Sequence, residues 1–595
     1  MLPMILGITF LAYGGALRYE FVYDDGEFIV RNQYLTSWSY LPRYFTEHLW
    51  SYQHRNRPGN YYRPLFLFWG LINRSLLGLN SVAWHFVTLM LYLGVVAMVY
   101  WLASRLLKDR AAAIIASAVF ALYPLHIETA AWVCGGSEAL LASFFIPAFF
   151  FYLKSRDHDE KTSGRNAATR WVVLSLAFYA AALFAKETAI TLPVIIIAYE
   201  LTVGSGSSPN KQKEKRDPSK TAFSRLREVW SLLLLYGLVT LVYLAIRAMV
   251  LGNLIYQPIR TTLLAKILTI PSLLWSYLKL LAWPLGLSEF YDTNYVETPG
   301  FGNFLFPLVG IVGVVLALGW VIKRIKVQRE RSVVVFACAW IVIPILPVLN
   351  IGTFSKGDLI HDRYLFLPTI GMALLIAYGV RQIKVGAGDL FGLPRTQALA
   401  ALVILGSLGV ATANQHVHWA NDIVLFHHSL SVAPDNELAQ VGFGNALINR
   451  EMYGDAAAVF ESLAQKHPEN AMGQYGAGYS YYKLGNYEQA LPYLSTAAEM
   501  KPPEPLRYVT LGVTLYYLGK YDEAEQILRQ GIRLRSHERG MHYALAAVFE
   551  ERGRFQEALD EYRQELEYNP DYASAYDQME QIKRRIGAGS THTAR

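Results

Sequence analysis

Long apolar runs recur along the first two thirds of this chain, and they constrain its fold more than any other feature. Between Met1 and about Ala413, segments long enough to cross a lipid bilayer follow one another, whereas beyond Ala420 the chain is charged and amphipathic. A hydrophobic fraction of 53% with 17% charged residues agrees with a membrane protein. We therefore expect a helical membrane domain over residues 1–415, then a linker helix over residues 416–435 and a separate second domain.

Eleven segments are predicted to cross the membrane. They lie near residues 2–17, 82–105, 111–125, 139–154, 171–185, 188–203, 230–250, 303–322, 333–351, 364–381 and 397–413. The apolar stretch 263–283 holds Pro271 and is followed by Pro284, so we interpret it as an interfacial or re-entrant helix pair. Counting this stretch as a crossing would reverse the side of the basic run at residues 323–331.

Basic residues are concentrated in four of the connections between these segments. They are the connections at residues 105–110, 154–170, 211–227 and 323–331, which the positive-inside rule predicts to be cytoplasmic. The intervening connections carry few basic residues and several carboxylates. Eleven crossings then place the N-terminus inside and the C-terminal domain outside. Because the basic residues mark topology in this way, the net charge of +7 does not indicate nucleic-acid binding.

The C-terminal part repeats itself every 34 residues from Asn436, which is the period of the tetratricopeptide repeat. Three sets of residues share a phase: Gly444, Gly478, Gly512 and Ala546; Ala456, Ala490, Ala524 and Ala558; and Pro468, Pro502, Ser536 and Pro570. Small residues let paired helices approach closely, and stacked repeats bury a continuous core. We expect four repeats with a C-terminal cap helix over residues 436–595, forming a surface that can bind a partner protein.

Ionisable residues beside membrane helices are candidates for function, and five clusters of them lie on the predicted outer side. Asp24 and Asp25 follow the first crossing, in the segment FVYDDGEFIV. Two adjacent carboxylates at a membrane exit can supply a general base, because burial and the neighbouring charge raise the pKa. The alternative is a helix cap or a solvated surface.

Basic residues lie in three further segments. Arg63 precedes a proline and an amphipathic run in NYYRPLFLF, Lys186 lies beside Glu187 in FAKETAITLP, and Arg363 lies in HDRYLFLP. Lys186 and Arg363 are suited to holding a phosphate group, because arginine binds phosphate through two parallel hydrogen bonds and lysine acts as a compact charge. A buried ion pair that only holds helices together is the alternative for these two residues.

His126 and Glu128 occur together in the segment YPLHIETAAW. They are candidates for an acid/base pair or for two metal ligands. A metal site usually needs three or four ligands, so the sequence supports no metal, and a cofactor requirement stays open.

Taken in order, these segments resemble the motifs of the transmembrane and tetratricopeptide-repeat-containing O-mannosyltransferases, the TMTC family, and of their prokaryotic relatives in the GT-C class of glycosyltransferases. The shared motifs are YDD, YYRPL, YPLHIETAAW followed by GGSE, AKETAITLP and DRYLFLP, with the repeats last. The sequence departs from the commoner motif sequences of the family at YPLHIE, where a second His-Pro is usual, and at HDRY, where ERY is usual. The resemblance implies an all-α, GT-C-like membrane domain followed by a tetratricopeptide-repeat solenoid.

The resemblance also implies an activity, which is transfer of a sugar, mannose, from a polyprenyl-phosphate donor to a hydroxyl of a protein acceptor on the extracytoplasmic face. It assigns the base to Asp24 or Asp25 and donor-phosphate binding to Lys186 and Arg363. Arg63, His126, Glu128 and Glu187 match motif positions whose roles stay unassigned. The expected location is the plasma membrane of a bacterium or archaeon, or the endoplasmic reticulum membrane of a eukaryote.

Two other functions are compatible with these residues. Intramembrane charges also mark the substrate paths of transporters and flippases, but the chain shows no repeated half and its charged clusters gather at one face. A membrane-anchored scaffold would use the repeats alone, and would leave Asp24, Asp25, Lys186 and Arg363 without a function.

Overall fold

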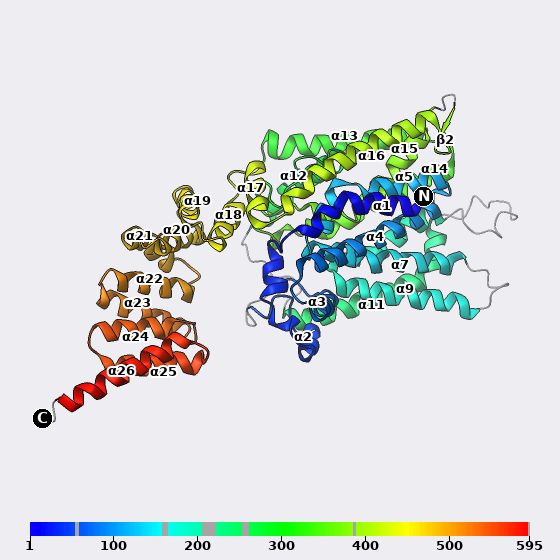
Figure 1. Ribbon diagram of the computed structural model, residues 1–595. Coiled ribbons are helices and arrows are strands. Elements are labelled where there is room, and N and C mark those ends of the chain that lie inside the picture. The colour runs from blue at the N-terminus through cyan, green and yellow to red at the C-terminus, as the bar shows by residue number, and fades with distance from the viewer. Residues whose placement is uncertain (54–58, 158–164, 205–221, 253–260, 385–387, 593–595) are drawn as a thin grey trace. The chain divides into compact units, whose positions relative to one another are not determined.

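The computed structural model describes residues 1–53, 59–157, 165–204, 222–252, 261–384 and 388–592. The chain divides into two compact units, Met1–Ala433 and Pro434–Arg595. Both units are built from helices (Figure 1). In the described ranges the only β-structure is an antiparallel hairpin formed by β1 (Asp389–Leu390) and β2 (Leu393–Pro394). The predicted all-α class is therefore confirmed.

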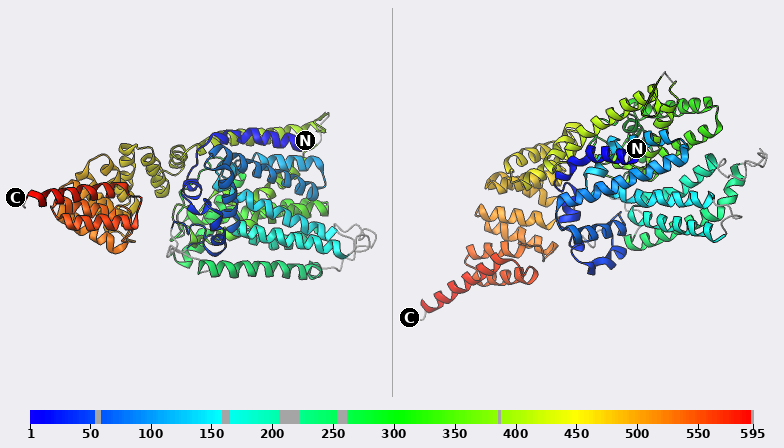
Figure 2. Two further views of the ribbon diagram at one scale, coloured as in Figure 1. Left: turned by 60° about the horizontal axis from the view of Figure 1, so that its bottom comes forward. Right: turned by 45° about the vertical axis from the view of Figure 1, so that its right-hand side comes forward.

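The first unit is a bundle of long helices that lie side by side, as Figure 2 shows. Its α-helices are α1 (Leu2–Tyr13), α2 (Leu41–Thr46), α3 (Pro64–Leu77), α4 (Ser81–Leu107), α5 (Arg110–Ala121), α6 (Ile127–Ala131), α7 (Ser137–Asp157), α9 (Arg165–Ala185), α10 (Leu192–Thr202), α11 (Ala222–Leu251), α12 (Leu263–Ala282), α13 (Phe306–Arg324), α14 (Gln328–Val342), α15 (Pro368–Arg381), α16 (Arg395–Gln415) and α17 (Asp422–Val432). Helix α4 packs against α5 and α7, α7 packs against α9, and α14 packs against α15. Each of the eleven predicted crossings coincides with helix.

Many of these helices are suited to a membrane. Among the described residues, seven helical segments are long and apolar enough to cross one: Ser81–Leu107, Cys134–Asp157, Val229–Leu251, Leu263–Ala282, Phe301–Arg324, Gln328–Leu349 and Arg395–Trp419. A bent pair, Arg110–Ala121 with Pro124–Ala131, passes the same test with a 55° bend. Many of their large apolar side chains are exposed, for example Leu316 and Val403, as lipid-facing positions require. This unit is therefore a membrane domain.

Helix α12 differs from the expected helix pair. It is one continuous helix with Pro271 inside it, and by length and composition it belongs to the seven segments above. The break expected at Pro271 is therefore absent. After α12 the chain reaches Glu289, which lies beside Arg363.

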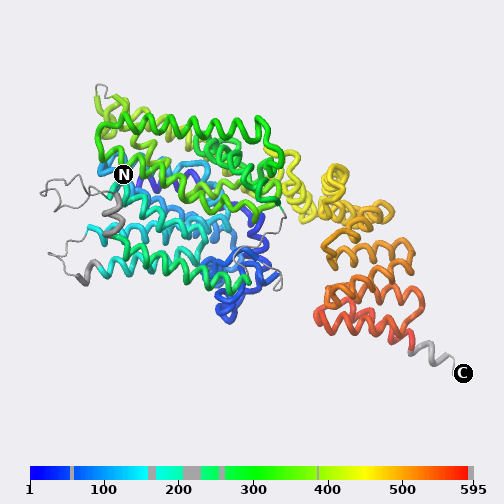
Figure 3. Tube along the Cα trace, turned by 180° about the vertical axis from the view of Figure 1, so that it is seen from behind, coloured from blue at the N-terminus to red at the C-terminus, as the bar shows by residue number. Residues whose placement is uncertain are grey.

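The second unit consists of antiparallel helix pairs. Its helices are α18 (Glu437–Asn449), α19 (Tyr453–Lys466), α20 (Ala471–Lys483), α21 (Tyr487–Glu499), α22 (Pro505–Tyr517), α23 (Tyr521–Leu534), α24 (Met541–Glu551), α25 (Phe555–Tyr568) and α26 (Ala573–His592). Figure 3 shows them as successive hairpins coloured from yellow to red. The pairs α18 and α19, α20 and α21, α22 and α23, and α24 and α25 follow the 34-residue period, and α26 packs on α25.

The small residues of the repeat explain how closely these helices pack. A Cβ atom added to Gly444 would lie 2.4 Å from the ring of Phe460, and one added to Gly512 would lie 2.5 Å from the side chain of Leu528. Each contact is shorter than real Cβ contacts allow, so only a residue without a side chain fits. The alanines of the second phase are fully buried between the helices.

Candidate functional site

Five connections between the helices of the first unit carry the predicted site residues, and side chains from them meet at one end of the bundle. There they line a cavity of about 90 Å³, which is large enough for several water molecules or for a group the size of phosphate. Its lining residues are Asp24, Leu49, Trp50, Tyr61, Arg63, Phe66, Trp132, Cys134, Ser137, Lys186, Arg363 and Tyr364. The cavity thus brings together one carboxylate and three cations that the sequence singled out.

Asp24 and Asp25 face in different directions. Asp24 is partly exposed and lines the cavity. Burial among protein groups raises the pKa of its carboxyl to about 6, and the nearby Arg363 limits the rise. A carboxyl with this pKa is ionised at neutral pH and remains basic enough to accept a proton.

Asp25 is fully buried and outside the lining of the cavity. Its Oδ1 accepts the backbone N–H of Cys134 at 2.8 Å, and its Oδ2 accepts the N–H of Val22 at 3.3 Å. Burial raises the pKa of Asp25 to about 7, while these hydrogen bonds oppose the rise. Asp25 therefore ties the loop after α1 to the segment that begins α7.

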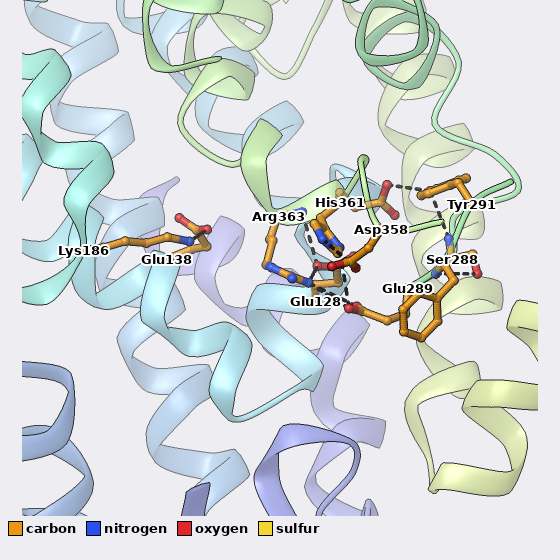
Figure 4. Close-up of polar contacts among 11 residues, drawn as sticks. Glu128, Glu138, Lys186, Ser288, Glu289, Tyr291, Asp358, His361 and Arg363 are labelled. Atoms are coloured by element: carbon orange, nitrogen blue, oxygen red, sulfur yellow. Dashed lines mark hydrogen bonds and ion pairs between the residues drawn. The ribbon is translucent and has the colours of Figure 1, made fainter. Parts of the chain in front are cut away.

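Arg363 lies in the short 3-10 helix η13 (Asp362–Leu365) and is held by two buried carboxylates. Its Nη1 donates to Glu128 Oε2 at 3.1 Å and to Glu289 Oε1 at 3.0 Å, as Figure 4 shows. Its guanidinium lies 5.3 Å from the ring centre of Trp132, a cation–π distance. Two carboxyl groups and an aromatic ring therefore fix the position of this cation.

Glu289 is a site residue that the sequence reasoning did not single out. It is fully buried, its pKa is raised well above the ordinary value by burial, and its Oε1 lies 3.7 Å from His361 Nδ1. His361 Nε2 in turn lies 3.2 Å from Asp358 Oδ1. Glu289 could have been singled out because it lies in the acidic connection at residues 288–300, which is on the predicted outer side.

Asp362, beside Arg363 in the motif HDRY, binds a tyrosine of another segment. Its Oδ1 accepts the Tyr291 hydroxyl at 2.6 Å, and burial raises its pKa well above the ordinary value. This carboxylate joins η13 to the connection that follows α12.

Arg63 and Lys186 also face carboxylates. Arg63 donates to Glu187 through Nε at 2.9 Å and through Nη2 at 2.5 Å, which is a bidentate pair. Burial alone would raise the pKa of Glu187, but Arg63 lowers it to about 2. Lys186 forms a buried ion pair with Glu138, the glutamate of the GGSE segment, as Figure 4 also shows, and burial lowers the pKa of its ammonium. Lys186 therefore lines the cavity and also forms an ion pair, the two roles between which the sequence left it open.

His126 and Glu128 have separate environments. His126 is buried in the core, where Tyr92 OH lies 2.9 Å from its Nδ1 and Thr369 Oγ1 lies 2.6 Å from its Nε2. Glu128 faces Arg363, and its Oε1 is buried without a hydrogen-bond partner. In the described part of the chain no three histidine, cysteine, aspartate or glutamate side chains are placed to hold a metal ion. The structure does not bring these two residues together as an acid/base or metal pair.

Comparison with known proteins finds similarity over both units. The family model described as Tetratricopeptide repeat matches residues 441–505 and 509–573, which confirms the predicted repeats. Among solved structures, a thermophilic tetratricopeptide-repeat protein of Thermus thermophilus is 23% identical, covers 30% of this chain and 94% of that chain, and has a TM-score of 0.24.

Curated relatives match most of the chain. It is 24% identical to the human protein O-mannosyl-transferase TMTC3 over 486 residues, which cover 77% of this chain and 50% of that protein. It is 25% identical to the Drosophila melanogaster protein of the same name, over 76% of this chain and 53% of the relative, and 25% identical to human TMTC4, over 72% and 61%. The chain spans about half the length of the curated relatives that it matches first. Over about three quarters of its length, the chain is therefore a homologue of the TMTC protein O-mannosyl-transferases, the family that its ordered motifs resemble.

Proposed function

We propose that this chain is a membrane glycosyltransferase that transfers a sugar, mannose, from a polyprenyl-phosphate donor to a hydroxyl of a protein acceptor. The observation that carries the proposal is the cavity in which Asp24 faces Arg63, Lys186 and Arg363, residues from four distant segments. The names of the relatives support the same reaction class.

Asp24 is the proposed general base. In the transfer, an oxygen of the acceptor hydroxyl forms a bond to the anomeric carbon of the sugar while the bond from that carbon to the phosphate oxygen breaks. The hydroxyl proton passes to Asp24, and polyprenyl phosphate leaves with the bonding electron pair. Since Asp25 accepts two backbone N–H groups outside the cavity lining, we assign to it the positioning of the loop.

Lys186 and Arg363 are the proposed partners of the donor phosphate, and Arg63 lines the same cavity. Negative charge grows on the departing phosphate as the bond breaks, so fixed cations stabilise the transition state more than the bound donor. Each cation is also held by at least one carboxylate, Glu138 for Lys186, Glu187 for Arg63, and Glu128 with Glu289 for Arg363. These ion pairs keep the cations in place before the donor binds.

The aromatic walls of the cavity suit the sugar. Trp50, Tyr61, Trp132 and Tyr364 line it together with the charged groups. Apolar and aromatic surface with a few convergent polar groups is the usual composition of small-molecule sites. The ring faces can cover the C–H face of a hexose while the cations hold its phosphate.

The location of the site supports a lipid-linked donor. The cavity lies at the ends of helices that are suited to cross a membrane, so the polyprenyl chain can remain in the bilayer during transfer. Tetratricopeptide repeats bind protein segments in many settings, and we propose that this array recruits the acceptor on the extracytoplasmic side.

The test is sugar transfer by the purified chain in lipid nanodiscs, with radiolabelled mannosyl-phosphoryl-polyprenol and a serine- and threonine-containing polypeptide. Asp24→Asn is expected to lower transfer about 10² to 10⁴-fold, the usual contribution of a general base. Glu27→Gln is the matched control, because Glu27 lies in the same segment, pairs with Arg31 and is outside the cavity lining.

Two results would contradict the proposal at different levels. A normal rate in Asp24→Asn would remove the assignment of the base. Absence of transfer by the unmodified chain with this donor would remove the reaction itself, and the transporter or scaffold functions would then be the ones to examine.

A further inference from the structure

The segment that leads to Asp24 is bound along the start of helix α17. The backbone N–H of Glu20 donates to the carbonyl of Ala420 at 3.1 Å. Three residues later, the N–H of Tyr23 donates to Asp422 Oδ1 at 2.7 Å. Two hydrogen bonds across about 400 residues of sequence thus join the loop after α1 to the end of the membrane unit.

Tyr23 has a backbone conformation that needs such support. Its φ is 54°, in the left-handed region that residues other than glycine rarely adopt unless their surroundings hold them there. Its ring packs against Trp132 at 5.6 Å and against Phe426 of α17 at 5.9 Å, measured between ring centroids. The turn at Tyr23 directs the next residue, Asp24, to the cavity and Asp25 to the Cys134 backbone.

Asp422 is well placed to stabilise this turn. It is the first residue of α17, and the capping of that helix is done by the residue before it, because Asn421 Oδ1 accepts the N–H of Val424 at 3.0 Å. The two neighbouring side chains therefore have different roles. Asn421 caps the helix, and Asp422 accepts the N–H of Tyr23, the residue before Asp24.

We infer that Asp422 is a positioning residue for Asp24. The inference rests on the proposed function, in which Asp24 is the base. A base must lie within about 3 Å of the proton that it takes, and a misplacement of about 1 Å lowers rates about 10²-fold. Asp422 acts through the backbone of Tyr23 and does not line the cavity.

The test compares three variants of the full-length chain in nanodiscs. Asp422→Ala removes the acceptor and is expected to lower kcat about 10- to 100-fold, with the KM for the donor within a few fold, because the cations are untouched. Asp422→Asn keeps Oδ1 as an acceptor and should recover kcat to within a few fold. Asn421→Ala, which removes the cap of the same helix, should leave kcat within a few fold.

A second measurement does not depend on activity. Amide hydrogen exchange of the peptide that contains residues 20–27 should be faster in Asp422→Ala than in the unmodified chain, and unchanged in Asn421→Ala, because only the first variant releases the Tyr23 N–H. Equal exchange in Asp422→Ala, Asn421→Ala and the unmodified chain would overturn the inference. So would equal losses of kcat in Asp422→Ala and Asn421→Ala, since the effect would then come from the stability of α17.

These outcomes are separable from a failure of the proposed function. If Asp24→Asn is inactive and Asp422→Ala has normal kcat and exchange, the inference is wrong and the function stands. If Asp24→Asn is fully active while Asp422→Ala shows faster exchange, the hydrogen bond orders the loop but the base is another group, and the inference fails as a statement about Asp24.

Discussion

Arg63, which lines the cavity, and Glu187 are 124 residues apart in the sequence and form a bidentate ion pair. The pair joins the loop before α3 to the connection between α9 and α10. Arg63 is largely buried, with 12% of its side chain exposed, so this partner offsets the cost of burying its charge.

Replacing Glu187 by glutamine is expected to lower the free energy of unfolding of the membrane unit by about 1.5 to 3 kcal/mol, the usual contribution of a hydrogen bond to a charged group. The measurement is thermal unfolding of the chain in detergent. Arg31→Gln is the control, because it breaks an ion pair whose arginine side chain is 65% exposed and which contributes about 0 to 1 kcal/mol. Equal stability of Glu187→Gln and the unmodified chain would argue against a structural role of the pair.

The pH dependence of transfer should report Asp24. Burial raises its pKa to about 6, and only the ionised form accepts a proton, so kcat/KM should fall about tenfold per pH unit below pH 6 and level off above it. Asp24→Asn should lose this acid limb. A profile whose acid limb lies near pH 4 would show that Asp24 does not titrate as the base.

The ionisation of Asp24 that raises the rate of transfer should lower the free energy of unfolding. Its pKa is higher in the folded chain than the value of 3.8 for a free aspartate, so the folded state binds more protons between about pH 4 and pH 6. The contribution of Asp24 to the free energy of unfolding is therefore lost as the pH rises through this window. Thermal unfolding of Asp24→Asn, which cannot ionise there, should show a smaller decrease over the same pH range.

Arg363 should affect donor binding as well as turnover. Arg363→Ala is expected to weaken the affinity for the polyprenyl-phosphate sugar, and Arg363→Lys should recover only part of it, because lysine cannot make the bidentate contacts of the guanidinium. The measurement is equilibrium binding of the donor to the chain in nanodiscs. Unchanged affinity in Arg363→Ala would limit its role to pairing with Glu128 and Glu289.

The repeat unit should unfold as an independent domain, and its stability should fall when a side chain is added at a glycine where helices are in close contact. In a fragment of residues 434–595, Gly478→Ala places a Cβ 2.6 Å from the side chain of Leu494, and such overpacking destabilises a core by about 1 to 3 kcal/mol. Gly454→Ala is the control, since a Cβ there meets nothing within 4 Å. Chemical denaturation followed by circular dichroism should show a lower midpoint for Gly478→Ala alone.

The predicted orientation can be tested with an impermeant thiol reagent in intact cells, after Cys134 and Cys338 are replaced. Thr298 lies in an acidic connection and Lys326 in a basic one, and both side chains are exposed. A cysteine at position 298 should be labelled from outside, and one at position 326 only after the membrane is permeabilised. Labelling of both from outside would contradict the eleven-crossing topology.

The helices and the repeats could be predicted from the sequence because their signals are local. An apolar run of membrane length and a 34-residue period are properties of contiguous residues, and each predicted crossing is helical in the structure. Charged residues in apolar surroundings also marked Asp24, Arg63, Lys186 and Arg363 individually as site candidates. Their common cavity needed the fold, because local patterns carry no distance between segments more than a hundred residues apart.

The sequence alone therefore determined the class of the chain, its repeat architecture and a set of candidate charges. Only the tertiary structure decided that Asp24 lines the cavity while Asp25 binds backbone, that His126 is a core residue, and that Glu289 joins Arg363. The physical reason is that neighbouring residues share the same local pattern, whereas burial, hydrogen bonding and ion pairing depend on which distant groups the folded chain brings within a few ångströms.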